Sequence, residues 1–300
     1  PESPAAKMIQ QAVVESIEKV AADATGYGLT AGQQELRDAA SQIVKDKGID
    51  VSSDGVMLVN GSQRALDLIG RTLIDPGDVV LLEMPTYTGA ISCFRNLGAT
   101  FAPVEVDEEG IKPDDLEAAV DNAKSTGRQV KMLYTIPNFQ NPTGSTLSAD
   151  RRKEIAALAE RENFLIVEDD IYGEIWFEES ETSPFRPIAS LAPQHTVYIN
   201  SFSKTVSPAL RAAYMAGPEW LMKKVEYLAQ AADLSAGTLD QMLVLSLLEN
   251  GVLQESLKSA RAHYREMCAV MRKSMDEFMP EGVTWNDPKG GFFLWVEVPD

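Results

Sequence analysis

The sequence has few of the residues that build disulfide frameworks and metal centres. Its 300 residues include two cysteines, Cys93 and Cys268, and two histidines, His195 and His263, which form no paired-ligand pattern. These counts argue against a disulfide-stapled fold and against a zinc site. Unpaired cysteines are typical of a reducing compartment, so we expect a cytoplasmic protein without a bound metal.

Long apolar runs and an excess of positive charge are also missing. No uninterrupted apolar stretch approaches the ~20 residues that a membrane span needs, and the N-terminus lacks the pattern of a signal peptide. Lys and Arg number 27 against 45 Asp and Glu, which gives a formal net charge of −18. Such a field repels phosphate backbones and favours solubility. We therefore expect neither a nucleic-acid nor a membrane partner.

What is present is an alternation of helix-like and strand-like segments. Helical spacing of apolar residues predicts helices over 34–47, 63–73, 113–124 and 149–162. Short apolar runs predict strands over 56–59, 79–82, 131–135, 164–167, 197–200 and 213–216. This order indicates an α/β fold, with helices on both faces of a mostly parallel sheet and ligands at the carboxyl ends of its strands. Ser148 is the expected N-cap of the fourth helix, with Arg151 and Arg152 on its exposed side.

The pattern changes after Gly237. Two long helix-like segments, 238–250 and 253–278, precede a strand-like segment over 291–298. We expect an N-terminal segment (1–25), a large domain (26–236) and the start of a smaller α+β domain (237–300). The chain has no initial methionine and stops just after a predicted strand, so we expect it to be part of a longer protein.

A lysine flanked by hydroxyl groups follows the predicted strand 197–200. Residues 200–205 read Asn-Ser-Phe-Ser-Lys-Thr, and Arg211 follows shortly after. The amine of Lys204 can form an imine with an aldehyde, while the hydroxyls and the guanidinium can hold a phosphate. Taken alone, the segment fits an exposed loop lysine beside ordinary serines equally well.

Three further polar clusters follow predicted strands. Asn141 lies in Pro-Asn-Phe-Gln-Asn-Pro-Thr-Gly over 137–144, which by itself would be a simple turn. Asp169 and Asp170 end an apolar run; one carboxylate can pair with a ring nitrogen and the other can cap a helix, since ligands for a metal are too few. Asn-Gly-Ser-Gln over 60–63 leads into a predicted helix whose free N–H groups favour a phosphate, without a nucleotide-binding pattern.

The order and spacing of Asn141, Asp169 and Lys204 resemble the fold-type-I pyridoxal-phosphate (PLP) aminotransferases of class I/II. The resemblance runs from about Tyr27 to the end of the chain. Residues 137–144 and 168–172 are most similar to the branch of 2-aminoadipate, kynurenine and broad aromatic or branched-chain aminotransferases. The resemblance implies pyridoxal 5'-phosphate as cofactor. The resemblance also implies transfer of an amino group from an L-amino acid to a 2-oxo acid by a ping-pong half-reaction through pyridoxamine phosphate.

The resemblance also implies a role for individual residues. Lys204 would hold PLP as a Schiff base and move the substrate proton, and Asp169 would lie against the pyridine nitrogen. Asn141 and Tyr172 would donate to the phenolic oxygen of the ring. The other implied contacts are ring stacking by Tyr87, which also fits a core tyrosine, and phosphate binding by Ser62, Gln63, Ser201, Ser203 and Arg211.

Tyr27 resembles the tyrosine that reaches the phosphate of a neighbouring subunit in this family. This implies a homodimer with shared active sites, and we expect Arg37 nearby to be structural. In the family, the arginine that holds the substrate α-carboxylate comes after the segment that resembles 290–295. No such arginine follows within this chain, so turnover by the chain as it stands is an open question.

Two alternatives remain open. A β-lyase or decarboxylase of the same fold type would share the cofactor residues. The effector-binding domain of an aminotransferase-like transcription regulator would share the fold, but it usually reads His-Gln-Phe-Pro-Thr-Gly and Glu-Asp-Asp-Tyr-Asp where this chain has 138–144 and 168–172. The chain also carries no basic helix-turn-helix segment.

Overall fold

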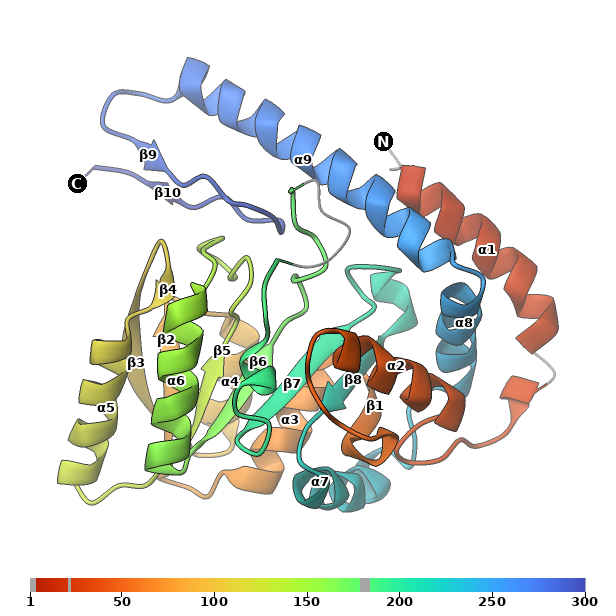
Figure 1. Ribbon diagram of the computed structural model, residues 1–300, viewed down its shortest axis with the longest axis horizontal. Coiled ribbons are helices and arrows are strands. Elements are labelled where there is room, and N and C mark those ends of the chain that lie inside the picture. The colour runs from red at the N-terminus through yellow and green to blue at the C-terminus, as the bar shows by residue number, and fades with distance from the viewer. Residues whose placement is uncertain (1–3, 21–22, 179–183, 300) are drawn as a thin grey trace.

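The fold is described from a computed structural model, which covers residues 4–20, 23–178 and 184–299 (Figure 1). Its centre is an eight-stranded sheet in the order β1-β8-β7-β6-β5-β2-β3-β4. The strands are β1 (Val56–Asn60), β2 (Val79–Met84), β3 (Thr100–Asp107), β4 (Gly110–Ile111), β5 (Val130–Thr135), β6 (Leu165–Asp169), β7 (Thr196–Ser201) and β8 (Ala212–Ala216). Strands β2, β3, β5, β6 and β7 are parallel neighbours, whereas β8 pairs antiparallel with β1 and β7. The predicted α/β fold with a mostly parallel sheet is confirmed.

The helices cover both faces of this sheet. They are α1 (Pro4–Val20), α2 (Gln34–Asp46), α3 (Ser62–Leu73), α4 (Thr88–Asn96), α5 (Pro113–Ser125), α6 (Ala149–Glu162), α7 (Glu219–Ala232), α8 (Thr238–Glu249) and α9 (Val252–Phe278). Helices α3, α4 and α7 share one apolar cluster with the sheet, while α5 and α6 pack on the opposite face and α2 packs beside them (Figure 1).

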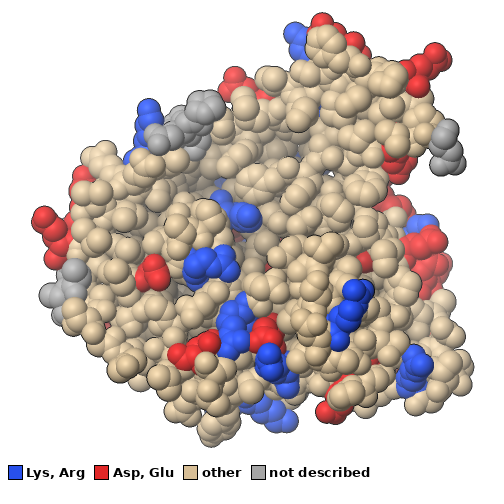
Figure 2. All heavy atoms as spheres, turned by 180° about the vertical axis from the view of Figure 1, so that it is seen from behind, with Lys and Arg blue, Asp and Glu red and all other residues tan. Residues whose placement is uncertain are grey.

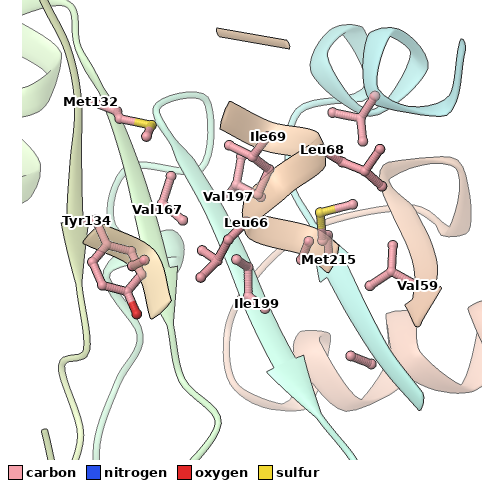
Figure 3. Packing of buried hydrophobic residues seen from close by; sticks show 14 of the residues in the cluster. Val59, Leu66, Leu68, Ile69, Met132, Tyr134, Val167, Val197, Ile199 and Met215 are labelled. Carbon is pink, nitrogen blue, oxygen red and sulfur yellow. The ribbon is translucent and has the colours of Figure 1, made fainter. Parts of the chain in front are cut away.

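Alternation along each strand explains why the sheet is buried on both sides. In β2, Val80 and Leu82 join the cluster beneath α3 and α4, whereas Val79 and Leu81 face α5 and α6. Successive side chains of a strand point to opposite faces, so a continuous apolar run supplies two cores at once. Figure 3 shows the first of these clusters, with Tyr134 among its aliphatic side chains. Full burial of each such aliphatic side chain stabilises the fold by about 1.5–3 kcal/mol.

The C-terminal part of the chain extends away from the sheet. Helix α9 is 27 residues long and leads to the short antiparallel pair β9 (Thr284–Trp285) and β10 (Val296–Glu297). Helix α1, which the sequence did not predict, lies along α8 and α9 (Figure 1), and the Ser16 and Ser246 hydroxyl oxygens are 2.8 Å apart. The division into residues 1–25, 26–236 and 237–300 stays a prediction.

Some local predictions were wrong. Only Val296–Glu297 of the strand-like segment 291–298 is a strand, because Gly290 and Gly291 turn the backbone against Ile175. Arg152 is 2% exposed, not on the open side of α6, because its guanidinium donates to the carbonyls of Leu147 and Pro137. No helix in the described ranges is long and apolar enough to cross a membrane.

Candidate active site

One edge of the sheet collects almost all of the predicted site residues. Strands β1, β2, β5, β6 and β7 point the same way and β8 points back, so five strand ends and one strand start share this edge. Carboxyl ends of parallel strands are where ligands bind in such sheets. The segments that leave this edge carry Ser62, Gln63, Tyr87, Asn141, Asp169, Tyr172, Ser201, Ser203, Lys204 and, before β8, Arg211.

Asp169 is a buried acid with one unused oxygen. Its Oδ2 accepts a 2.8 Å hydrogen bond from the Tyr134 hydroxyl. Its Oδ1 is buried and has no hydrogen-bond partner among the described residues. Burial raises the pKa of Asp169 to about 7, although the bond from Tyr134 opposes that rise. A buried acceptor left open in this way is suited to a donor that a ligand supplies.

The acids on either side of Asp169 point to the other face of the sheet and have their own partners. Glu168 accepts 2.8 Å hydrogen bonds from the backbone N–H groups of Ile188 and Ala189. Burial raises the pKa of Glu168 to about 7. The alternation of β6 thus separates Asp169 from its neighbours, because successive side chains of a strand face opposite ways.

Asp170 does not cap a helix, and that alternative from the sequence is wrong. Its Oδ1 accepts from Asn138 Nδ2 at 2.6 Å, and its Oδ2 accepts from the Tyr198 hydroxyl at 2.6 Å. Lys47 Nζ lies 3.7 Å from the same Oδ2. No helix begins at Asp170, because the chain turns there toward Ile175 instead. Asp170 therefore anchors the strand end that presents Asp169.

Asn141 and Tyr172 present two polar groups side by side. Asn141 Nδ2 lies 3.4 Å from the Tyr172 hydroxyl. Burial and the nearby charge of Asp169 raise the pKa of Tyr172 to about 12. The Tyr172 ring packs edge-on against Phe292 and Phe293, whose centroids are 5.8 and 5.4 Å away. The predictions from sequence did not include these two rings in the site.

Gly61, at the turn into α3, allows Arg211 to lie against the first turn of that helix. Its φ is +86°, and a Cβ there would lie 2.3 Å from Arg211 Nη2. The N–H groups at the start of a helix have no intrahelical partners and favour an anion. Ser201 and Ser203 lie on the neighbouring segment, with their hydroxyl oxygens 2.9 Å apart. The arrangement is a cradle of backbone N–H, hydroxyl and guanidinium donors.

Tyr87 is half-buried and held by a residue from the same helix start. Its hydroxyl donates to Gln63 Oε1 at 3.1 Å, and Gln63 Nε2 donates to the Gly89 carbonyl at 3.2 Å. A Cβ at Gly89 would lie 2.3 Å from the Tyr87 ring, so only glycine allows the ring to fold back over its own turn. Gln63 therefore uses its side chain on Tyr87, which leaves its backbone N–H for the cradle.

Of Lys204 and Tyr27, only Lys204 lies at the edge of the sheet where the other site residues lie. Lys204 is exposed, in the turn that follows β7 at the shared edge. Figure 2 shows several Lys and Arg side chains near the middle of the face opposite to that of Figure 1. Tyr27 is 93% exposed on the segment before α2, and the structure does not bring it into this set of residues.

The described residues fit PLP. Asp169 Oδ1 offers an open, buried acceptor to a protonated ring nitrogen, and the cradle at Gly61 offers donors to a phosphate. No group of three His, Cys, Asp or Glu side chains in the described ranges is placed to hold a metal ion. The role of Tyr134 was not predicted from the sequence. One feature could have indicated it: a buried tyrosine hydroxyl needs a hydrogen-bond partner, and the strand of Tyr134, β5, comes directly before β6 in the predicted order of strands.

The chain belongs to the aminotransferase class I and II family, which matches residues 3–300. It is a PLP-dependent aminotransferase of fold type I. The predicted family, enzyme class and cofactor are thus confirmed.

Three curated relatives illustrate the range of the family. An aromatic-amino-acid aminotransferase 1 of Thermococcus litoralis is 36% identical over 100% of this chain and 72% of its own length. A 2-aminoadipate transaminase of Thermus thermophilus is 37% identical over 89% of this chain and 72% of its own length. The uncharacterized HTH-type transcriptional regulator YisV of Bacillus subtilis is 34% identical over 90% of this chain and 54% of its own length.

Among solved structures, a kynurenine aminotransferase of Pyrococcus horikoshii in complex with PMP is similar throughout. The TM-score is 0.91 at 36% sequence identity, covering 98% of this chain and 72% of that one.

Proposed function

We propose that the chain transfers an amino group from an L-amino acid of the 2-aminoadipate, aromatic or branched-chain type to a 2-oxo acid, in ping-pong half-reactions through pyridoxamine phosphate. The single observation that carries the proposal is the open Oδ1 of buried Asp169, held by Tyr134 at the edge where Lys204 also lies. A decarboxylase or β-lyase shares the cofactor residues. The aromatic, 2-aminoadipate and kynurenine relatives favour amino transfer.

PLP supplies an aldehyde that takes up the amino group and a ring that accepts electrons from the substrate Cα. Lys204 would be the covalent anchor of PLP, and its amine would move the proton at Cα of the substrate. Asp169 would keep a proton on the ring nitrogen, because a carboxylate at an open buried position stabilises a cation there. Asn141 and Tyr172 would donate to the phenolic oxygen of the ring.

Binding of the phosphate and of the ring involves the other site residues. The phosphate would be held by the donors described above, from Ser201, Ser203, Arg211 and the N–H groups of Ser62 and Gln63. Tyr87 would stack on the ring and keep water from that face. Together these contacts would orient the substrate at the cofactor, which is how a protein adds selectivity to cofactor chemistry.

A homodimer with shared sites completes the proposal. Tyr27 is 93% exposed and Leu29 and Leu234 are more than half exposed, which suits burial against a second copy of the chain. Tyr27 would then reach the phosphate held by the partner copy. Sedimentation of the purified chain checks the dimer. The cytoplasmic location likewise stays a prediction.

The deciding experiment is an absorbance spectrum of the purified chain with PLP, before and after addition of glutamate, 2-aminoadipate, leucine or phenylalanine. We expect the band of bound PLP to convert to that of pyridoxamine phosphate with some of these donors, and the ranking to identify the substrate type. A band that no donor shifts would contradict amino transfer by this chain.

A further inference from the structure

Glu83 is a buried acid at the end of β2 that no step above uses. It is 2% exposed. Its Oε1 accepts a 2.6 Å hydrogen bond from the Thr135 hydroxyl, and its Oε2 accepts from the Ile136 N–H at 3.1 Å. Oε2 also accepts from Gln140 Nε2 at 3.1 Å. Within the described ranges no Lys, Arg or His forms an ion pair with Glu83, so these three donors stabilise its charge.

Gln140 continues this connection on both sides. It is 1% exposed, and its Nε2 also donates to the Pro85 carbonyl at 2.7 Å. Its Oε1 accepts from the N–H and the hydroxyl of Thr143, at 2.9 and 2.8 Å. Asn141 thus lies between Gln140 and Thr143, which are bonded to each other, and Pro85 lies two residues before Tyr87. One amide therefore touches both loops of the site.

We propose that Glu83 and Gln140 are positioning residues that lock the loop carrying Asn141 (137–144) to the loop carrying Tyr87 (85–87). The relevance of the lock to the cofactor rests on the function proposed above. Neither residue touches the proposed ring position; both act through Asn141 and Tyr87.

The lock needs a hydrogen-bond acceptor at position 83. The Ile136 N–H and Gln140 Nε2 can only donate, and both donate to Oε2, whereas the Thr135 hydroxyl at Oε1 can also accept. A neutral amide with its N–H₂ group toward Thr135 would therefore keep the lock, so the test variant must remove both oxygens. Two titratable groups face Glu83: Asp169 on β6 and Tyr134 on β5. The charge of Asp169 adds to the raised pKa of Glu83, and the charge of Glu83 adds to the raised pKa of the Tyr134 hydroxyl. Both are acidic. Burial raises the pKa of Glu83 to about 7, with the bonds from Thr135, Ile136 and Gln140 opposing the rise.

Glu168 is the matched control. It is also a fully buried glutamate at a strand end of this edge, and burial raises its pKa to about 7 as well. Its oxygens accept from the Ile188 and Ala189 N–H groups on the opposite face of the sheet. Glu168→Met therefore tests the cost of removing a buried carboxylate while the bonds from Thr135, Ile136 and Gln140 to Glu83 stay in place. Glu168 lies 3.9 Å from Arg152 Nη1, and Arg152 also donates to Pro137 and Asn138, so the exchange is compared only after residue 138.

The first test uses hydrogen–deuterium exchange of the chain without PLP. We expect Glu83→Met, which keeps length but removes both acceptors, to speed amide exchange of the peptide spanning 139–145 by about fivefold or more, the equivalent of one lost hydrogen bond. Gln140→Met, which keeps length but removes the amide, gives the same change if Glu83→Met does not fold. Unchanged exchange in this peptide, or equal change in Glu168→Met, would overturn the proposal.

The second test follows bound PLP by absorbance as the pH is varied. We expect the midpoint to rise by about one pH unit in Glu83→Met, since a displaced Asn141 stabilises the phenolic anion less. The Glu83→Met/Gln140→Met double variant should shift no further than either single variant, because both remove the same connection. Equal midpoints in all variants would overturn the proposal.

The two tests separate this inference from the function proposed above. If the unaltered chain binds no PLP, the proposed function fails, while the exchange experiment still decides whether Glu83 and Gln140 lock the loops. If PLP binds normally and the exchange and the midpoint are both unchanged, the proposed function stands and the lock is wrong.

Discussion

The Tyr134 hydroxyl donates a 2.8 Å hydrogen bond to Asp169 Oδ2, and Asp169 Oδ1 stays open beside it. Tyr134 lies on β5 and Asp169 on the adjacent parallel strand β6, so the hydrogen bond joins two neighbouring strands. The bond orients the carboxylate and leaves one oxygen for the ring nitrogen of PLP. Oδ2 thus accepts from the protein and Oδ1 is left for the cofactor, and the first prediction follows from this arrangement.

Tyr134→Phe should slow amino transfer by about tenfold or more, since a hydrogen bond to a charged group contributes about 1.5–3 kcal/mol. Steady-state rates with the best donor of the panel provide the measurement. PLP should still bind, because the phosphate cradle is untouched. A variant with unchanged rates would show that Tyr134 does not orient Asp169 during catalysis.

Lys204→Ala should abolish the covalent attachment of PLP, because the amine at this position forms the bond to the aldehyde. Borohydride reduction followed by mass spectrometry measures the attachment, and Lys223→Ala on α7 serves as the control. We expect a reduced PLP adduct on the control and none on Lys204→Ala. An adduct at the usual yield in Lys204→Ala would assign the anchor to another lysine.

Asp169→Asn should retain PLP but lower the rate of amino transfer by at least about 100-fold. The neutral amide no longer favours a proton on the ring nitrogen, so the ring accepts electrons poorly. Single-turnover kinetics by absorbance measure the loss. Asp150→Asn, an exposed position on α6, should react at the normal rate. Near-normal turnover of Asp169→Asn would contradict the assigned role.

Asp169 should also make the stability of the cofactor-free chain depend on pH. Its pKa rises from 3.8 to about 7 on folding, so the folded chain binds more protons than the unfolded chain between these values. The free energy of unfolding should therefore fall with rising pH across this window, by up to about 1.4 kcal/mol per unit from this group, and level off above it.

Urea unfolding from pH 4.5 to 8 measures this dependence. Asp169→Asn should show a flatter profile than the unaltered chain, because the amide does not titrate. Saturating PLP should flatten the profile too, since a cation beside Asp169 lowers its pKa. Parallel profiles in the unaltered chain and the variant would mean that Asp169 does not carry the raised pKa.

Arg152→Met should destabilise the fold by about 3 kcal/mol or more, because it leaves buried acceptors without their donor. Those acceptors are the carbonyls of Leu147, Arg186 and Pro137 and the Asn138 side chain. The neighbouring Arg151→Met removes a more exposed pair with Asp107 and should cost about 1 kcal/mol or less. Urea unfolding of the two variants compares them, and equal losses would contradict the buried role of Arg152.

Much of the fold could be predicted because strands and helices leave local patterns. The predicted helix over 149–162 coincides with α6, and the predicted strands over 79–82 and 197–200 lie within β2 and β7. Strand β3 was missed, since Pro103 and exposed polar residues interrupt its apolar pattern. Helix α1 was missed too, because its contacts are with α8 and α9, at the other end of the chain.

The sequence by itself determined the class of protein, through the resemblance of its motifs to a known family, and the chain order of the site. Apart from Tyr27, the site residues lie near the end or the start of a strand that local apolar content makes recognisable. Only the tertiary structure decided which side chains meet. Tyr134 reaches Asp169, and Glu83 reaches Gln140, because β5 lies between β2 and β6 in the sheet. Strand order depends on long-range packing, which no local spacing encodes, so contacts across strands could not be predicted from the pattern that predicted the strands.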